Sequence, residues 1–254
     1  MQKNNIAEVV LKKEVDWRRL KMKIVSWNCA SKFREKHTSI IGEDADIYVI
    51  CECEDPARAK VKEYVEFAGN NYFWTGDLHY KGLGIFAKDN VKLEKLEEFC
   101  DTPFKNFIAL RVNDSFNLLG VWAMPKYVEM IHDYFDTNSD LFNEDLIMCG
   151  DFNSNAIWNN QHKTKDSEGN AKDQTNLNKK LNKKGLFSAY HDLTSEKQGK
   201  ETQYTFYQYR HLDEPYHIDY VYTTKDRVIG FKFGDVDKWI ELSDHVPITF
   251  EIKE

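Results

Sequence analysis

Short apolar runs separated by polar turns follow one another along this chain. Apolar runs of about four to eight residues, bounded by Gly, Asn, Asp or Pro, are typical of strands that pack into a core. The pattern predicts strands over residues 22–27, 46–51, 72–75, 83–87, 107–112, 116–123, 146–149, 202–209, 218–223, 228–233 and 246–252. Residues 113–115 would form the turn of a hairpin.

Helical spacing is found between several of these strands. Asp55-Pro56 is a suitable helix start, with Asp55 as the cap and Pro56 at the first helical position. The apolar face of that helix would consist of Val61, Tyr64, Val65 and Ala68. The other predicted helices cover residues 32–41, 127–141 and 177–186. Strands and helices mixed in this way indicate an α/β fold.

No repeat, low-complexity tract or linker divides the chain. We therefore expect one domain over residues 22–254, preceded by an N-terminal extension over residues 1–21. Residues 154–175, rich in Asn, Lys, Asp and Gly, would form a long loop.

The stretch Gly150-Asp151-Phe152-Asn153 follows an apolar run and presents a carboxylate and an amide two residues apart. In an extended segment residues i and i+2 share a face, so Asp151 and Asn153 are expected to point into one pocket while Phe152 points into the core. Gly150 leaves room for a close ligand or a sharp exit from the strand. Taken alone, these four residues fit an ordinary turn after a buried strand about as well as they fit a functional site.

Other apolar runs also end at, or contain, a polar residue. Asn28 follows residues 24–27, Glu52 follows residues 49–51, and Asp219 lies inside residues 218–221. Asp244 and His245 stand directly before the run that starts at residue 246. Each of these fits a cap, a turn or a paired charge when taken singly, but together they predict a shared metal or phosphate site.

Three of these residues suit a divalent metal ion. Glu52, Asn28 and Asp244 offer hard oxygen ligands, and Mg²⁺ is usually held by one or two carboxylates while it keeps several waters. We expect Mg²⁺, or Mn²⁺, as the cofactor.

The remaining residues suit acid–base chemistry. Asp151 is a candidate to orient or deprotonate a water, and Asn153 to donate to a phosphoryl oxygen. His245, oriented by Asp219, is a candidate to donate to the phosphate or to the leaving group. Ser243 lies in no Gly-x-Ser-x-Gly elbow, so a water nucleophile fits better than a serine.

Composition and charge narrow the function classes. The 254 residues are 41% hydrophobic and 14% aromatic, which is ample for a core. The formal charge of −7 argues against a protein that binds nucleic acid through a large excess of basic residues. A nuclease is not excluded, because a bound divalent ion reverses the sign of the electrostatic field that the substrate meets at the site. The five cysteines are odd in number and lie mostly in apolar runs, which fits reduced thiols. No apolar run is long enough to cross a bilayer, so we expect a cytoplasmic protein with no membrane insertion.

The short motifs resemble, in order and spacing, those of the endonuclease/exonuclease/phosphatase superfamily, which is DNase I-like. The resemblance covers roughly residues 22–252. The motifs that carry it are Trp27-Asn28, Ile50-Cys51-Glu52, Lys81-Gly82-Leu83-Gly84-Ile85-Phe86, Gly150-Asp151-Phe152-Asn153, His217-Ile218-Asp219-Tyr220 and Ser243-Asp244-His245-Val246-Pro247.

The resemblance implies a four-layer α/β/β/α sandwich, with two mainly antiparallel sheets packed face to face and flanked by helices, and a site at one edge. It also implies that Asn28 and Glu52 surround the metal. Asp151 and Asn153 would act on the nucleophilic water and the phosphate. His245 would pair with Asp219.

Two positions depart from the pattern of the superfamily. Many members carry a catalytic His at the end of the strand matched by Leu119-Gly120-Val121-Trp122, and some abasic-site endonucleases carry a Tyr one place on. This chain has Trp122 and Ala123 there, which puts the leaving-group step in doubt. His217 stands where many members have Arg or another residue, and it fits a phosphate contact or a structural role equally well. We include His217, Trp122 and His79, near the Gly-rich turn, as substrate-binding candidates.

Three hypotheses follow. The first is a Mg²⁺- or Mn²⁺-dependent phosphodiesterase, with DNA favoured as substrate through the resemblance. The second keeps the chemistry but takes a small phosphoester, such as an inositol phosphate, a phospholipid head group or a nucleotide. The third is a catalytically silent binding module, against which the intact acidic and histidine residues argue. The sequence does not distinguish endo- from exo-cleavage or give the oligomeric state.

Overall fold

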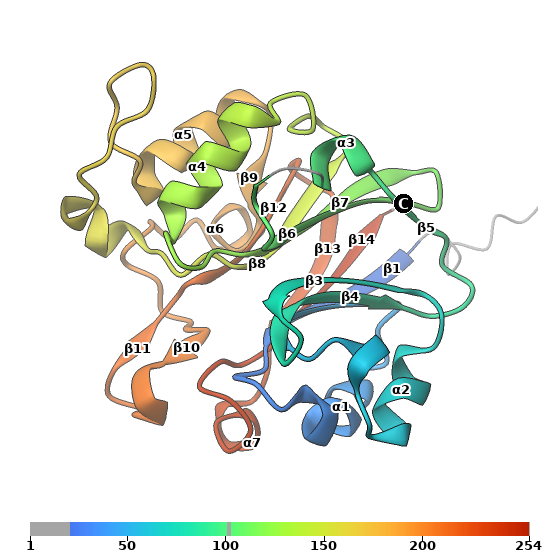
Figure 1. The fold of residues 1–254 in the computed structure, drawn as a ribbon. Helices are drawn as coiled ribbons and strands as arrows, with labels where there is room; N and C mark the ends of the chain where they lie inside the picture. Colours follow the sequence, from blue (N-terminus) through green and yellow to red (C-terminus); the bar gives the residue numbers. More distant parts are fainter. Residues whose placement is uncertain (1–20, 101–102, 254) are drawn as a thin grey trace, which may run out of the picture.

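Two six-stranded sheets pack face to face in the computed structural model, which describes residues 21–100 and 103–253 (Figure 1). The N-terminal extension expected over residues 1–21 lies outside the described residues, apart from Lys21, which opens the first strand. The first sheet has the order β13-β14-β1-β2-β4-β3 and the second the order β5-β6-β7-β8-β12-β9. A small ribbon, β10 with β11, stands apart from both sheets.

Most neighbouring strands run antiparallel. One parallel pair lies near the middle of each sheet, β1 with β2 in the first and β7 with β8 in the second. The strands are β1 (Lys21–Asn28), β2 (Ile47–Cys53), β3 (Tyr72–Leu78), β4 (Lys81–Ala87), β5 (Leu93–Lys95), β6 (Phe107–Val112), β7 (Phe116–Trp122), β8 (Leu146–Asp151), β9 (Phe187–Ser188), β10 (Phe206–Tyr207), β11 (Pro215–Tyr216), β12 (Asp219–Thr223), β13 (Val228–Phe233) and β14 (Ile248–Lys253).

Helices cover the outer faces of both sheets (Figure 1). Phe33 of α1, Tyr64 of α2 and Trp239 of α7 pack on the first sheet, while Ile131 of α4 and Leu177 of α5 pack on the second. The helices are α1 (Phe33–Ile41), α2 (Lys62–Ala68), α3 (Glu97–Cys100), α4 (Val128–Thr137), α5 (Gln174–Lys183), α6 (Ala189–Thr194) and α7 (Val236–Trp239). The expected α/β/β/α sandwich is therefore confirmed.

Apolar residues on alternating strand positions fill the space between the sheets. Val49 of β2, Ile85 of β4, Leu118 of β7 and Ile147 of β8 are fully buried there. A core of this kind is stabilised chiefly by the apolar surface that it removes from water.

The structure differs from the sequence-based elements at several places. Asp55 caps only a short 3₁₀ turn, Pro56–Arg58, and the regular helix α2 begins later; Val65, expected in its apolar face, is exposed. Of the strand expected over residues 202–209, only β10 is formed. The flanking residues of this segment make their backbone hydrogen bonds to loops and not to a sheet. The loop expected over residues 154–175 contains a 3₁₀ helix, Ala156–Gln161.

None of the five cysteines, all of which the structure describes, forms a disulfide, and four of them are buried. Within the described parts of the chain, no helix is both long and apolar enough to span a bilayer.

Candidate active site

Gly150 brings the end of β8 unusually close to the neighbouring strand β7. It has a φ of 144°, and a Cβ atom built on it would lie 1.9 Å from the carbonyl oxygen of Val121. No other residue fits this position without moving the backbone. The close neighbour is therefore a strand, and not a ligand as the sequence had allowed.

Asp151 follows at the end of β8 and is held by three hydrogen bonds. Its Oδ1 accepts the backbone N–H of Asn153 at 2.8 Å, and its Oδ2 accepts the side-chain amides of Asn153 and Asn28, each at 2.9 Å. Asn153 lies beyond the strand with a φ of 47°. A turn, and not the alternation of an extended strand, therefore brings Asn153 to Asp151, while Phe152 is buried in the core as expected.

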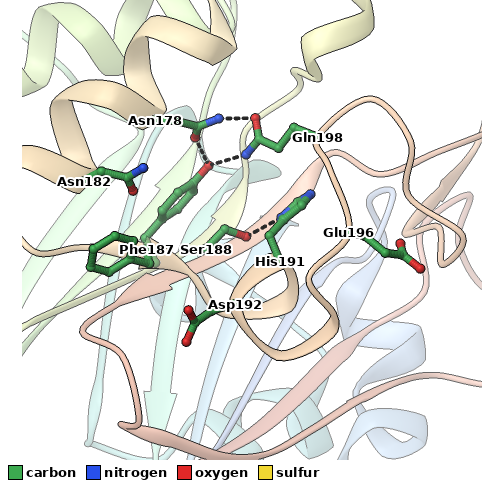
Figure 2. Close-up of a pocket in the computed structure, with 9 residues that line it drawn as sticks. Asn178, Asn182, Phe187, Ser188, His191, Asp192, Glu196 and Gln198 are labelled. Atoms are coloured by element: carbon green, nitrogen blue, oxygen red, sulfur yellow. Dashed lines mark hydrogen bonds between the residues drawn. The ribbon is translucent and has the colours of Figure 1, made fainter.

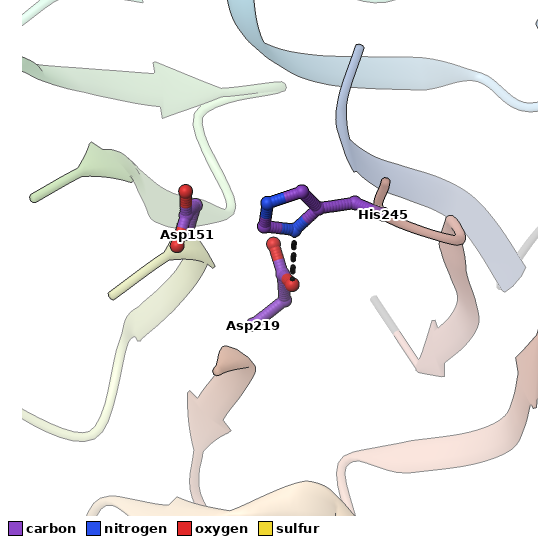
Figure 3. A group of neighbouring side chains, drawn as sticks. All are labelled: Asp151, Asp219 and His245. Carbon is purple, nitrogen blue, oxygen red and sulfur yellow. Dashed lines mark hydrogen bonds and ion pairs between the residues drawn. The ribbon is translucent and has the colours of Figure 1, made fainter. Parts of the chain in front are cut away.

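Asp219 and His245 lie next to this carboxylate (Figure 3). Asp219 is the register partner of Asp151 on the adjacent strand β12, so their side chains share a face. His245 arrives from the loop before β14, and its Nδ1 lies 2.8 Å from Oδ2 of Asp219. One possible ligand atom from each of the three side chains lies within 4.8 Å of the others. The expected contact between Asp219 and His245 is present, while the roles of these two residues in a reaction stay predictions.

Burial and neighbouring charges shift the pKa of both reactive groups. Burial, with the nearby Asp219 carboxylate, raises the pKa of Asp151 to about 7. Burial on its own would lower the pKa of His245, but the charge and hydrogen bond of Asp219 outweigh it and raise that pKa to about 10. At neutral pH His245 is therefore an imidazolium, while Asp151 is near its midpoint.

Glu52 sits at an irregularity in the pairing of β2 with β4. The register shifts between Cys51 and Cys53, and Glu52 has a φ of 65°. A bulge of this kind re-aims one side chain. Here the Glu52 carboxylate, with its side chain 17% exposed, meets the ammonium of Lys81 at 2.9 Å.

Trp122 ends β7 directly beside Asp151, its register partner in the parallel pair of β7 and β8. Trp122 as a whole residue is 8% exposed, and the ammonium of Lys81 lies 5.5 Å from the ring centroid. The indole N–H is buried, and no acceptor for it is found among the described residues. Trp122 thus adjoins Asp151, and its indole has no group that titrates near neutral pH as a histidine would.

The two other metal candidates lie at loop junctions around the cluster. Asn28 ends β1, and its Oδ1 accepts the backbone N–H of Ala30 at 3.0 Å, so its amide joins Asp151 to the chain leaving β1. Asp244 is half-buried beside His245, and the neighbouring Ser243 hydroxyl donates to the carbonyl of Asn28 at 2.7 Å. Their roles as metal ligands stay predictions.

His217 and His79 lie in contrasting environments. His217 is 2% exposed, packs on Tyr190 at 4.7 Å between ring centroids, and lies 3.0 Å from the carbonyl of Gln203 through Nδ1. Burial lowers the pKa of His217 to about 4, so its ring is neutral at pH 7, which favours the structural role over a phosphate contact. His79 is exposed in the turn between β3 and β4, two residues before Lys81.

A separate hollow of about 250 Å³ lies between α5 and α6 (Figure 2). Several of its polar side chains pair with one another: Ser188 Oγ lies 2.8 Å from His191 Nδ1, and the Tyr222 hydroxyl donates to Asn178 at 2.5 Å. None of the residues in the Asp151 cluster lines it. The hollow is bordered by Asn178, Asn182, Phe187, Ser188, His191, Asp192, Glu196, Gln198 and Tyr222.

Several solved structures are similar in fold to this chain. The 3'-5' exonuclease NExo from Neisseria meningitidis has a TM-score of 0.66 at 19% identity, over 92% of this chain and 100% of that chain. An AP endonuclease from Archaeoglobus fulgidus has a TM-score of 0.64 at 18% identity, over 92% and 99%. The fold is DNase I-like. A humanized D. rerio TDP2 is also similar, with a TM-score of 0.60 at 15% identity, over 92% and 99%.

No protein-family model and no curated protein sequence matches the chain. The DNase I-like fold confirms the architecture that the motifs implied.

Sequence reasoning missed two residues that contact members of the candidate site. The hydroxyl of Thr205 accepts the backbone N–H groups of Ile218 and Asp219, at 3.0 and 3.1 Å, and so fixes the start of β12. Nothing in the sequence marks that contact. Lys81, which pairs with Glu52, stands at the head of a motif already quoted for the resemblance, so its position was a usable signal.

Proposed function

We propose that this chain is a divalent-metal-dependent phosphodiesterase that hydrolyses DNA, with a water nucleophile activated by Asp151. The observation that supports this most is the buried acid–base pair. A carboxylate with a pKa of about 7 lies beside an imidazole with a pKa of about 10, both within the cluster of Asp151, Asp219 and His245. A base that titrates near the working pH is the most effective proton acceptor.

The residues of the cluster have different roles in the proposed reaction. The Asp151 carboxylate accepts a proton from the attacking water, while Asn28 and Asn153 hold it in place. His245, kept protonated by Asp219, donates a hydrogen bond to an oxygen of the phosphate, where negative charge gathers in the reaction. Because a protonated imidazole has no free lone pair for a metal, we assign His245 to the phosphate and not to the ion.

A divalent ion would be held by Glu52, with Asn28 and Asp244 as further oxygen donors. This donor set suits Mg²⁺ or Mn²⁺. The fit is supported by the Glu52 carboxylate, which is only 17% exposed and already has a cation against it. When bound, such an ion polarises the phosphoryl oxygens and offsets the negative charge of the site.

The preference for DNA rests on the similar structures. One of them is a 3' phosphatase NExo from Neisseria, solved with a product DNA hairpin, at 19% identity and a TM-score of 0.65 over 92% of this chain and 100% of that chain. The net negative charge of the chain is compatible with a DNA substrate, because the divalent ion and the His245 imidazolium would supply positive charge at the site itself.

Hydrolysis of a substrate panel tests the proposal. Single-stranded, duplex and abasic DNA, RNA, and inositol and nucleotide phosphates would be compared with Mg²⁺, Mn²⁺ or EDTA. We expect cleavage of DNA that needs a metal and stops in EDTA. If only the small phosphates were hydrolysed, the substrate would be a small phosphoester and not DNA. If no compound of the panel were hydrolysed, a binding module without catalytic activity would be favoured.

Replacing Glu52 by glutamine tests the metal site. The amide keeps the shape but removes the charge that a divalent ion requires, so we expect Mn²⁺ affinity, measured by calorimetry, to fall about tenfold or more. Glu63→Gln, an exposed carboxylate on α2, is the control and should bind Mn²⁺ as the wild type does. Unchanged affinity in Glu52→Gln would remove this residue from the ligands.

A further inference from the structure

Lys81 joins the two halves of the candidate site. It opens β4 in the first sheet, and its ammonium lies 2.9 Å from Oε2 of Glu52. The same ammonium lies 5.5 Å from the ring centroid of Trp122, which belongs to the second sheet. The lysine side chain is 36% exposed, whereas Trp122 as a whole residue is 8% exposed. The cation therefore rests at the mouth of the site, on the carboxylate that we assign to the metal.

The pairing of Lys81 with Glu52 is of a kind that a divalent ion displaces. An ammonium on a flexible four-carbon stem at a partly exposed position gains little from an ion pair. A divalent ion carries twice the charge and is held by several oxygen donors at once. The indole face of Trp122 offers the released ammonium a second favourable contact, so it need not leave the mouth of the site.

The surroundings of the released ammonium suit a phosphate. Trp122 is the register partner of Asp151, so a cation over the indole lies beside the candidate base. The other groups gathered there include the carboxylates of Asp151, Asp219 and Asp244, which repel an anionic substrate. A lysine serves as a point charge for phosphate oxygens.

We propose that Lys81 is a phosphate-binding residue that rests on Glu52 in the metal-free protein and turns to the substrate phosphate when a divalent ion takes that carboxylate. The inference deepens the proposed function and rests on it for the identity of the substrate. Trp122 then supplies the platform on which the lysine is held, in place of the titrating side chain that many superfamily members carry at that strand end.

Lys81→Met tests both parts of this inference, because it keeps the length of the side chain and removes its charge. Without the competing ammonium, we expect Mn²⁺ binding in a calorimeter to become about threefold to fivefold tighter, the scale of one exposed ion pair. Binding of a short phosphorothioate DNA strand in Mn²⁺ should weaken. The slope of log affinity against log salt should fall by about 0.7, as for the loss of one phosphate contact with a single strand.

Lys88→Met is the matched control. Lys88 follows the opposite end of β4, is similarly exposed, and pairs with Asp44 at 2.8 Å, outside the site. It should leave Mn²⁺ affinity and the salt slope unchanged. If both variants changed these two quantities equally, the effect would come from the net charge of the protein and not from the position of Lys81. That outcome would overturn the proposal.

The two binding measurements decide the inference separately from catalysis. Wild-type Mn²⁺ affinity in Lys81→Met would refute the competition for Glu52, and an unchanged salt slope would refute the phosphate contact. If both changes are seen but no phosphodiester in the panel is cleaved, the proposed hydrolysis fails and the binding role of Lys81 stands. Absence of Mn²⁺ binding in wild type and variant alike would overturn both.

Discussion

Asp151→Asn is expected to lower the rate of DNA hydrolysis by about a thousandfold, the scale of losing a positioned general base. The amide keeps the size of the side chain but cannot accept a proton from water. The measurement is turnover of the best substrate in Mg²⁺ or Mn²⁺ under saturating conditions. Full turnover by the variant would remove Asp151 from the role of base.

The loss should come from chemistry and not from unfolding. Burial raises the pKa of Asp151 to about 7, so the folded protein loses the stabilisation of the protonated form as the pH rises from about 4 through 7. An uncharged amide is free of this loss, although its single oxygen cannot accept all three hydrogen bonds that reach Asp151. Thermal unfolding at pH 8 should therefore still show a folded variant with one cooperative transition. Asp145→Asn, at the exposed opposite end of β8, is the control and should keep full activity.

Asp219→Asn is expected to lower activity at pH 8 by about a hundredfold and to move the pH optimum downward. Burial lowers the pKa of His245, and the charge and hydrogen bond of Asp219 are the largest effects that raise it, so without Asp219 the ring should lose its proton at a lower pH. Asp219 also raises the pKa of Asp151 after the larger effect of burial, so that pKa should fall as well. Both limbs of the pH–rate profile therefore shift to lower pH.

The wild-type profile should rise through pH 7, as Asp151 loses its proton, and fall through pH 10, as His245 loses its own. A titration of the histidine ring signals by NMR would report the His245 pKa directly. Glu201→Gln is a useful control, because Glu201 accepts from His191 at 3.1 Å in a carboxylate–histidine pair outside the cluster. It should leave both limbs in place, whereas an unmoved profile in Asp219→Asn would show that His245 is not held as proposed.

The main strands and the reactive residues could be predicted from the sequence because both leave local signals. The strand over residues 228–233 was predicted with the bounds of β13, and the hairpin of β6 and β7 turns at Asn113 and Asp114, both with positive φ. Asp151 and Asp219 were marked by carboxylates in apolar runs, where an unpaired charge is costly. Such positions stand out without knowledge of the fold.

Contacts between distant segments could not be predicted in this way. Asn28 was expected near the metal, yet its amide also donates to Asp151, 123 residues later. The short elements β9, β11 and α7 depend on pairing or packing with residues far along the chain, and too few apolar positions mark them. The exposure of Val65 has the same origin, because the direction of the helix was decided by Phe33 and Tyr64 packing together.

The site is assembled from both sheets of the sandwich, and two side-chain hydrogen bonds join its halves. Asn28 of the first sheet donates to Asp151 of the second, and His245, entering the first sheet, meets Asp219 of the second. Between the sheets, Gly120 lies so close to Ile85 that an added Cβ would come within 3.0 Å of its Cδ1. The packing of the core therefore sets the distance between the two sheets at the site. In this way apolar residues that never contact a substrate fix the distance between the Asp151 carboxylate and the His245 imidazolium.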